Sequence, residues 1–542
     1  MTQQNKPWLS HYDSGVPVEI DIPNLSLVDL LQQAVQLFGK STCIISNGTQ
    51  QTYQQVDMLS NKMAHYLISK GIKRGDRVGL VLPNIPAFVI SYFGILKVGA
   101  VVTALNPMFH LSEIKNIFLE SAVRVVVLPG NLYRELKPIQ EKLGIDSFIV
   151  VNQDDNDLSD DDISWEEINR QRKGDRPVPV NVTGDDPAVF QYSGGTTGTP
   201  KCAIGLHRNL VANVFQFHHW LINTELGKET ILVAIPLYHV YGMVLGMILT
   251  IKMGARMVLI SNPGDLDHLL GVVERFRASI FPGVPNLYAA INHYPPVLEG
   301  KFNLSSIKAC ISGSTTLPLA VKQEFEALTG GHLVEGYGLS EAPTATHCNP
   351  VLGENRIGSI GLPLPNVDCK IVDLENGEKE VDVDGVGELI IRGPQVMSGY
   401  YNQPKETEMT LRDGWLFTGD VVRMDRDGYF YIVDRKKDVI KVGGFQVWPN
   451  EIEAVISQHP KVREVAVAGV LDGEGNESAK AWIVLNKDKI CTLEEIRSFC
   501  ESHLTRYKIP RMIEFRESLP RTRVGKVLRR TLVAEHQPKI KK

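Results

Sequence analysis

The sequence has few cysteines, and they lack the spacing of a metal site. Seven cysteines are scattered over 542 residues, and no two of them are arranged as C-x-x-C. An odd number at irregular spacings disfavours both a disulfide framework and a structural zinc site. We therefore expect a reducing, cytoplasmic environment for Cys43, Cys202, Cys310, Cys348, Cys369, Cys491 and Cys500.

The sequence also lacks a long apolar run and a secretory signal. Its longest apolar run, VYGMVLGMILTI at residues 240–251, ends at Lys252, whereas a membrane span needs about 20 residues. This length predicts a buried helix. The first residues, MTQQNKPWLSHYDSG, contain no apolar segment followed by a small-residue cleavage site, so no secretory signal is expected.

Positive and negative charges nearly balance in this sequence. The formal net charge is -5, which argues against a protein that binds duplex nucleic acid, because such proteins carry a basic surface. With 43% hydrophobic and 22% charged residues, the composition is typical of globular proteins. A chain of this length exceeds one hydrophobic core, so two or more domains are expected.

Helix-like and strand-like segments alternate between about residues 52 and 130. The short β-branched runs RVGLVL, AVVTAL and VRVVVL are separated by longer amphipathic stretches. This pattern indicates a parallel sheet covered by helices, and hence a layered α/β domain. By contrast, residues 154–167 are acidic with few large apolar side chains, which favours a solvated loop.

The pattern changes after Asp368. CKIVDL, GELIIRG and YFYIVDR predict the short strands of a β-rich subdomain. We place a domain boundary near Asp434, which gives an amino-terminal domain of residues 1–434 and a mobile α+β carboxy-terminal domain of residues 435–542.

The carboxy-terminal domain carries clear helix signals. Pro449 predicts the first turn of the helix EIEAVISQH, and Thr492 with Glu495 predicts a capping box that opens TLEEIRSFCESHL. EVAVAGV and AKAWIVL read as strands.

The segment YSGGTTGTPK at residues 192–201 is rich in glycine and hydroxyl groups. It is no P-loop, because Thr199 and Pro200 separate Gly198 from Lys201 and Cys202 follows. Both flanks, PAVFQY and CAIGLH, read as strands. A plain turn is the alternative, but this composition favours a cradle for phosphate, formed by Ser193, Gly194, Gly195, Thr196, Thr197, Gly198, Thr199 and Lys201.

This loop resembles the phosphate-binding signature of the adenylate-forming superfamily, which includes acyl-CoA synthetases, beetle luciferases and peptide-synthetase adenylation domains. Other segments are similar to the superfamily's motifs, in the same order: LYHVYG (237–242), SGSTTLP (312–318), EGYGLSE (335–341), GWLFTGD (414–420), YIVDRKKDVIKVGG (431–444) and PRTRVGKVLRR (520–530). Two features, the adjacent Gly194 and Gly195 and the segment PNEIE (449–453), are most similar to those of bacterial medium- and long-chain fatty acyl-CoA ligases.

The resemblance implies an enzyme that activates a carboxylic acid in two steps. The acid would attack the α-phosphorus of ATP to form an acyl-adenylate with loss of pyrophosphate, and coenzyme A would then displace AMP. Glu341 matches the superfamily's Mg²⁺ ligand and Thr197 its partner, in keeping with an ion that needs one or two protein oxygens beside phosphates. Lys526 matches the lysine that bridges the substrate carboxylate and the α-phosphate, and His239 matches a histidine at the entrance of the acyl pocket.

The resemblance also implies contacts to the nucleotide and to coenzyme A. Tyr337 would stack on adenine, Asp420 would accept both ribose hydroxyls, and Arg435 would add a ribose or phosphate contact. Lys437 matches the hinge about which the carboxy-terminal domain rotates between the two steps. Further positions carried over as nucleotide or coenzyme A contacts are Ser314, Thr315, Glu335, Gly336, Gly338, Ser340, Ile432, Lys441, Gly443 and Gly444, and those for the acyl chain are Tyr238, Val240, Gly313, Gly336 and Leu339.

Two departures and several alternatives stay open. Cys202 and Gly443 occupy positions where relatives have glycine and lysine, respectively. An aryl-acid CoA ligase, acyl transfer to a carrier-protein thiol, and a non-catalytic nucleotide- or acyl-binding protein are the other readings. The carboxy-terminal basic residues offer contacts to coenzyme A phosphates or to an anionic membrane surface, and a solvated tail is the plainer alternative. Oligomeric state, including a homodimer, is left open.

Overall fold

The computed structural model describes residues 6–152, 158–171, 174–193, 201–442, 445–471, 477–521 and 527–536. The chain forms two compact units. The large unit comprises Trp8–Asp368 and Arg392–Gly414, and the small unit comprises Met1–Pro7, Cys369–Ile391 and Trp415–Lys542. The domain boundary between residues 434 and 435 stays a prediction.

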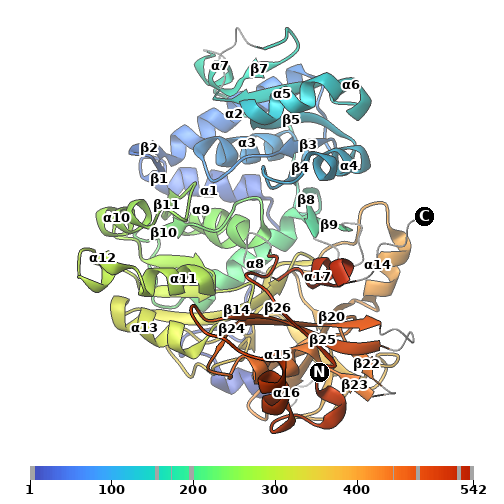
Figure 1. Ribbon diagram of the computed structural model, residues 1–542. Coiled ribbons are helices and arrows are strands. Elements are labelled where there is room, and N and C mark those ends of the chain that lie inside the picture. The colour runs from blue at the N-terminus through green and yellow to red at the C-terminus, as the bar shows by residue number, and fades with distance from the viewer. Residues whose placement is uncertain are drawn as a thin grey trace. The chain divides into compact units, whose positions relative to one another are not determined.

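One sheet of the large unit is parallel at its centre and antiparallel at its ends (Figure 1). β10, β11, β12, β13 and β1 pair in parallel, while β2, β15 and β16 pair antiparallel. In spatial order the strands are β16 (Leu362–Pro363), β15 (Ala342–Cys348), β14 (His332–Leu339), β13 (Ala309–Ser312), β12 (Ile280–Gly283), β10 (Thr230–Val233), β11 (Arg256–Leu259), β1 (Thr42–Ser46) and β2 (Thr49–Thr52).

The other sheet of the large unit confirms the parallel α/β pattern expected from residues 52–130. Its strands pair in parallel except for the antiparallel pair β8–β9. In spatial order they are β7 (Ile163–Ser164), β6 (Ser147–Val151), β5 (Val123–Pro129), β3 (Arg77–Leu80), β4 (Val101–Ala104), β8 (Pro187–Ser193) and β9 (Lys201–Leu206).

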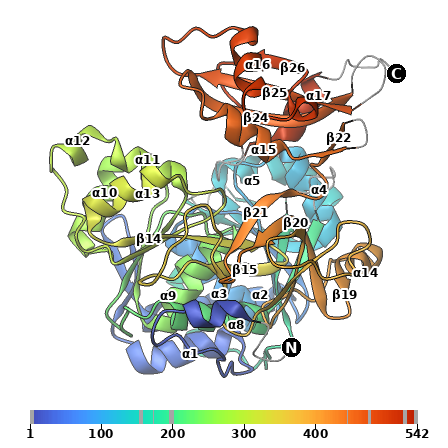
Figure 2. The ribbon, with the colours of Figure 1, turned by 90° about the horizontal axis from the view of Figure 1, so that it is seen from below.

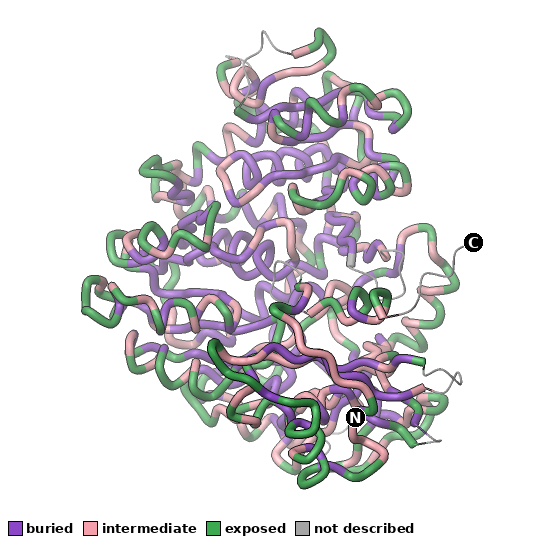
Figure 3. The backbone as a smooth tube through the Cα atoms, viewed as in Figure 1, coloured by how far each residue is buried: buried purple, intermediate pink, exposed green. Residues whose placement is uncertain are grey.

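Helices bury their apolar stripes against these sheets, whose strands are mostly buried (Figure 3). Leu269 of α10, Tyr288 of α11 and Phe325 of α13 share one core with β10 and β12. Burial of such side chains is the main source of stability, at roughly 25 cal/mol per Å². The helices are α1 (Leu27–Phe38), α2 (Tyr53–Ser69), α3 (Pro86–Lys97), α4 (Leu111–Ser121), α5 (Gly130–Leu136), α6 (Gln140–Leu143), α7 (Trp165–Arg170), α8 (His207–Trp220), α9 (Leu249–Met253), α10 (Leu266–Phe276), α11 (Pro285–Asn292), α12 (Pro295–Leu298), α13 (Leu319–Thr329) and α14 (Pro404–Thr410).

The apolar run at residues 240–251 is a buried helix, as its length predicts, but its first part is wider than an α-helix. Gly242–Ile248 (η5) is a π-helix that continues into α9. A Cβ at Gly242 would lie 2.3 Å from the backbone oxygen of Pro236. The glycine therefore lets the preceding loop approach the start of the helix.

The acidic stretch at residues 154–167 is not a loop throughout. Its described end enters β7 and α7. The Ser164 hydroxyl accepts a hydrogen bond from Glu167 N at 3.0 Å, which caps α7. Pairing of Ile163 with Ile149 holds β7 on β6. Residues 153–157 lie outside the described part.

The small unit contains antiparallel strands followed by a compact α+β region. β18 (Val386–Arg392), β20 (Trp415–Met424) and β21 (Phe430–Arg435) pair antiparallel, and β22 (Ile440–Val442) forms a hairpin with β23 (Phe445–Val447). The remaining elements are β17 (Asp368–Val372), α15 (Pro449–Ile456), β24 (Val462–Leu471), β25 (Glu477–Leu485), α16 (Leu493–Glu501), β26 (Met512–Phe515) and α17 (Arg529–His536).

In the small unit, helices pack on both faces of the sheet β24–β25–β26 (Figure 2). Ile452 of α15 and Ile496 of α16 share a core with one face. Leu532 of α17 packs with Trp482 on the other face. The capping box predicted at Thr492 and Glu495 is present at the start of α16.

All seven cysteines lie in described residues, and all are buried and outside disulfide bonds. Among the helices described, none is both long enough and apolar enough to cross a membrane.

Candidate active site

Three of the predicted motifs meet at one edge of the first sheet of the large unit. β10, β12 and β13 are parallel, and the segments 234–242 and 313–315 leave the carboxyl ends of β10 and β13. β14 pairs in parallel with β13 as far as Ser312 and Glu335, where EGYGLSE begins. Ligands of open α/β sheets bind at this edge.

Tyr241 joins the first two motifs. Its hydroxyl donates to Ile311 O at 2.5 Å and accepts from Gly283 N at 3.1 Å, so it links the ends of β12 and β13. A Cβ at Gly313 would lie 3.4 Å from the Tyr241 ring and 3.8 Å from Gly336 O. The missing side chains of Gly313 and Gly336 therefore bring the three segments close together.

His239 is half-buried and neutral. Tyr241 N donates to its Nδ1 at 3.2 Å, which puts the imidazole proton on Nε2. Burial lowers the pKa of His239 to about 4. At neutral pH the side chain thus offers an uncharged N–H donor. Its neighbours Tyr238 and Val240 are half-buried and buried, respectively, and Gln191 Nε2 of β8 donates to Tyr238 O at 3.4 Å.

Glu335 begins the third motif as a buried carboxyl. Leu317 N donates to its Oε2 at 3.2 Å. Burial raises its pKa to about 8, despite that hydrogen bond. At neutral pH Glu335 therefore keeps a proton and adds no charge to the site.

The rest of EGYGLSE forms the hairpin between β14 and β15. The Tyr337 ring lies edge-on to His347, with centroids 5.8 Å apart, and burial lowers the pKa of His347 to about 3. A Cβ at Gly338 would lie 1.5 Å from Thr344 O. Leu339 pairs with Ala342, and Ser340 stands in the turn.

Ser314 and Thr315, just beyond β13, are exposed. Ser314 has φ +78°, a left-handed conformation that is uncommon for a residue other than glycine. The segment thus turns sharply as it leaves the sheet.

The glycine-rich segment joins β8 and β9 of the second sheet. Residues 194–199, which include Gly194, Gly195, Thr196, Thr197, Gly198 and Thr199, lie outside the described part, as does the Ser193 side chain. The strands pair up to Ser193 and Lys201, so a strand follows the loop where a P-loop would open a helix. Cys202 belongs to β9 and is buried in the core of this sheet.

Two residues that the sequence motifs do not contain contact the predicted site in the large unit. The Tyr400 hydroxyl donates to Glu341 Oε1 at 2.8 Å, and Glu406 forms an ion pair with Lys201. Burial, with the charge of Glu341, raises the pKa of Tyr400, so the hydroxyl stays protonated. The sequence signal available was GYYNQPKETE, an aromatic pair before an acidic helix.

Asp420 and Arg435 of the small unit are brought together by a strand pair. They face each other across β20 and β21, and Arg435 Nε lies 3.1 Å from Asp420 Oδ1. Asp420 is buried, whereas the Arg435 side chain is 37% exposed. A carboxylate has two acceptor oxygens, which suits it to hydroxyl groups. Ile432 lies two residues before Asp434 on β21 and pairs with Val422.

Lys437 is exposed and directly follows Lys436, whose Nζ lies 2.7 Å from Glu388 Oε2. Lys441 is exposed on the β22–β23 hairpin. Gly443, Gly444 and Lys526 lie outside the described part.

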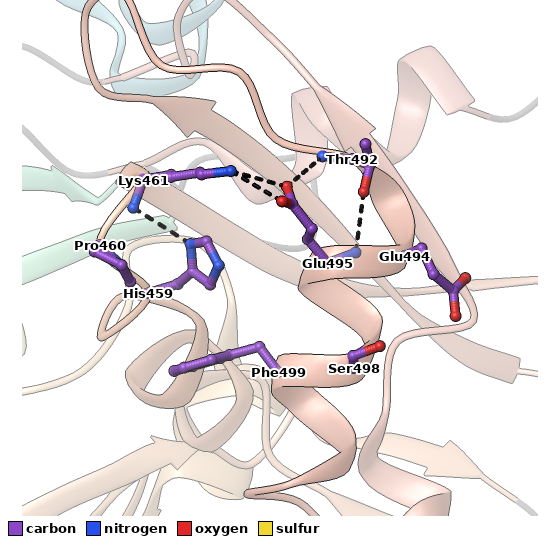
Figure 4. Close-up of a pocket in the computed structure, with 8 residues that line it drawn as sticks. All are labelled: His459, Pro460, Lys461, Thr492, Glu494, Glu495, Ser498 and Phe499. Carbon is purple, nitrogen blue, oxygen red and sulfur yellow. Dashed lines mark hydrogen bonds and ion pairs between the residues drawn. The ribbon is translucent and has the colours of Figure 1, made fainter.

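The small unit also holds a pocket at the start of α16 (Figure 4). Its polar groups bond to one another: Lys461 Nζ lies 2.9 Å from Glu495 Oε1, and Glu495 N donates to the Thr492 hydroxyl at 3.1 Å. None of the predicted site residues lines it; the lining residues are His459, Pro460, Lys461, Thr492, Glu494, Glu495, Ser498 and Phe499. These contacts cap a helix.

The described donors fit Mg²⁺ held mainly by phosphates and water. In the described part of the chain, no three His, Cys, Asp or Glu side chains cluster as a metal site. Glu341 is half-buried and presents hard carboxylate oxygens, and Mg²⁺ commonly takes one or two such ligands beside a nucleotide.

Comparison with known proteins extends these observations over the whole chain. Residues 31–401 match the family described as AMP-binding enzyme, and residues 451–526 match the AMP-binding enzyme C-terminal domain. A long-chain-fatty-acid–CoA ligase of Bacillus subtilis (strain 168) is 38% identical, with 98% of each chain covered.

Two solved structures are similar in fold. ATP-bound MatB from Rhodopseudomonas palustris has a TM-score of 0.85 at 26% identity, covering 95% of this chain and 99% of that one. The anthranilate CoA ligase AuaEII, in complex with anthranoyl-AMP, has a TM-score of 0.83 at 27% identity, covering 95% of this chain and 98% of that one.

Proposed function

Because the chain belongs to the AMP-binding enzyme family, we propose that it is an AMP-forming fatty acid–CoA ligase that acts on medium- or long-chain acids. It uses ATP to form an acyl-adenylate with release of pyrophosphate, and coenzyme A then takes the acyl group as AMP leaves. The observation that carries this proposal is the full-length similarity to a long-chain-fatty-acid–CoA ligase, together with the meeting of three motifs at one sheet edge.

The first chemical step joins two anions, so binding groups must neutralise and orient them. His239 donates through Nε2 to an oxygen of the acid or the nucleotide, and it adds no charge because its pKa lies near 4. Gly313, which lies beside the Tyr241 ring, and Gly336 border the acyl group without side chains of their own. Tyr337 offers its ring to adenine.

The glycine-rich segment 193–201 binds the β- and γ-phosphates through backbone N–H groups, hydroxyls and Lys201. Glu341 and Thr197 would hold Mg²⁺. When bound, Mg²⁺ supplies positive charge that stabilises the charge gathering on the phosphate oxygens.

The small unit contributes the remaining roles. Asp420 accepts the ribose hydroxyls, with Arg435 beside it. Lys526 bridges the carboxylate and the α-phosphate during adenylation. Rotation of residues 435–542 about Lys437 then withdraws Lys526 and presents residues 441–444 to the thiol of coenzyme A. We further propose a cytoplasmic location with peripheral membrane contact, which fits a fatty substrate.

An aryl acid is the alternative substrate. The chain is similar to an anthranilate CoA ligase over 95% of its length, which supports an aryl acid as the alternative. An acyl pocket bordered by glycines also accommodates a ring as well as a chain.

The proposal is tested by AMP release that depends on ATP and Mg²⁺, measured with and without coenzyme A. The panel runs from acetate to oleate and includes benzoate and cinnamate types. We expect turnover on medium- and long-chain acids that requires coenzyme A. Turnover only on aryl acids would support the aryl-acid CoA ligase instead. No turnover on any acid would contradict the proposal that the chain is a CoA ligase.

A further inference from the structure

The segment at residues 397–401 connects two parts of the large unit that carry predicted phosphate and metal contacts. On one side, Tyr401 N donates to Cys202 O at 2.9 Å, next to the lysine that ends the glycine-rich segment. On the other side, Met397 N donates to Glu341 O at 2.8 Å. The backbone of this segment is therefore fixed to both parts.

Tyr400 makes the same connection with its side chain. Its hydroxyl donates to Glu341 Oε1 at 2.8 Å. The face of its ring lies under Lys201, with Nζ 5.3 Å from the ring centroid. Tyr400 N donates to the Thr407 hydroxyl at 2.9 Å, and the residue is 8% exposed, so its position is well determined by its surroundings.

Lys201 is held on two sides. Besides the Tyr400 ring, its ammonium pairs with Glu406 of α14. A cation above an aromatic face is attracted by the negative face of the ring. The ring and the Glu406 carboxylate thus determine where the ammonium lies relative to Glu341.

We propose that Tyr400 is a positioning residue that orients Glu341 for Mg²⁺ through its hydroxyl and seats Lys201 for the phosphates through its ring. The inference rests on the proposed function. A donor that occupies one carboxylate oxygen restricts rotation of the carboxylate and leaves the other oxygen for the ion.

The two contacts are separable by substitution. Tyr400→Phe removes the hydroxyl and keeps the ring under Lys201, whereas Tyr400→Leu removes both. Tyr401→Phe is the matched control: Tyr401 also belongs to this segment, but its ring packs on Phe190 with centroids 4.6 Å apart.

The measurement is binding of α,β-methylene-ATP at increasing Mg²⁺ by isothermal titration calorimetry, alongside acyl-CoA formation under the same conditions. For Tyr400→Phe we expect the half-saturating Mg²⁺ concentration to rise on the order of tenfold, as is typical when a partner of a metal ligand is lost. Saturating Mg²⁺ should restore most of the analogue affinity. Tyr400→Leu should bind the analogue more weakly than wild type even at saturating Mg²⁺.

Each result separates this inference from the proposed function. If wild type forms acyl-CoA but Tyr400→Phe titrates with Mg²⁺ like Tyr401→Phe, the orienting role of the hydroxyl is wrong. If Tyr400→Leu and Tyr400→Phe behave alike at saturating Mg²⁺, the seating of Lys201 is wrong. Wild type that forms no acyl-CoA from any acid would overturn the ligase itself.

Folding is checked independently by circular dichroism and thermal melting of each variant. Should Tyr400→Phe melt well below wild type, Tyr400→His, which keeps a ring and an N–H donor, takes its place. We expect Tyr400→His to need less Mg²⁺ than Tyr400→Leu, and equal Mg²⁺ requirements would contradict the orienting role.

Discussion

At Gly338 the chain leaves no room for a side chain, because a Cβ would lie 1.5 Å from Thr344 O. We expect Gly338→Ala to displace a strand of the β14–β15 hairpin, destabilise the fold by about 1–3 kcal/mol and reduce turnover. Gly271→Ala in α10 is the control: a Cβ there meets nothing within 4 Å, and alanine is favoured in helices. Urea denaturation measures both variants, and an unchanged midpoint for Gly338→Ala would contradict the clash.

Glu335 makes stability depend on pH. Its folded pKa of about 8 lies above the ordinary value of 4.5, so the folded protein keeps a proton that the unfolded chain releases. Stability from this group is complete below about pH 4.5 and is lost as pH rises towards about 8. Glu335→Gln has no carboxyl to titrate and so does not lose this stability. Between about pH 4.5 and pH 8, its free energy of unfolding should therefore rise relative to that of wild type by about a few kcal/mol.

Urea denaturation of wild type and Glu335→Gln at several pH values checks this expectation. Glu494→Gln, on an exposed position of α16, should follow wild type at every pH. A constant difference between wild type and Glu335→Gln would show that the folded carboxyl titrates as it does in the unfolded chain.

At the scale of elements, one arginine ties α17 to α15. Arg529 Nη2 lies 2.8 Å from Glu453 Oε2 and donates to Asn450 Oδ1 at 2.6 Å. Because removing one partner leaves the other charge partly buried and unpaired, Arg529→Ala should cost about 3 kcal/mol. Arg463→Ala, which loses an exposed pair with Glu464, should cost less than about 1 kcal/mol.

Chemical denaturation followed by tryptophan fluorescence compares these two variants, and Trp482 lies in the small-unit core. Equal losses for the two variants would mean that the Arg529 pair is as weak as a solvent-exposed one.

Elements with local signals were predictable from the sequence. α15 starts at Pro449, and α16 starts after the Thr492 cap, because caps act within one helical turn. The π-helix at Gly242–Ile248 was not predictable, since an apolar run of this length does not distinguish a π-helix from an α-helix. The strand β7 was missed as well, because its pairing with β6 depends on the sheet rather than on its own composition.

At the scale of the whole molecule, the motifs predicted which residues gather in the large unit but not how they are held. The Tyr400–Glu341 contact joins residues 59 positions apart, and Lys201 and Glu406 are 205 positions apart. The Tyr400 contact forms because residues 398–401 lie beside β9, and α14, which follows them, brings Glu406 to Lys201. No periodicity or spacing in the sequence carries that information.

The two-step proposal predicts a selective defect for Lys526→Ala. We expect this variant to lose adenylation, because in the proposed mechanism the lysine bridges the two reacting anions, and to retain thioester formation from supplied acyl-adenylate. Separate assays of pyrophosphate release and of acyl-CoA formation from acyl-adenylate check this, with Lys542→Ala as the control. Equal loss of both steps would contradict the rotation of residues 435–542.

The rate at which the buried cysteines react with a thiol reagent reports how often the fold opens around them. Burial raises the pKa of Cys491 and of Cys500 to about 11 each, and burial also raises the pKa of Cys43 and of Cys310. A reagent that adds to thiolates must therefore wait for the surrounding core to separate. Labelling at Cys491 and Cys500 therefore reports opening of the small unit, and labelling at Cys43 and Cys310 reports opening of the large unit.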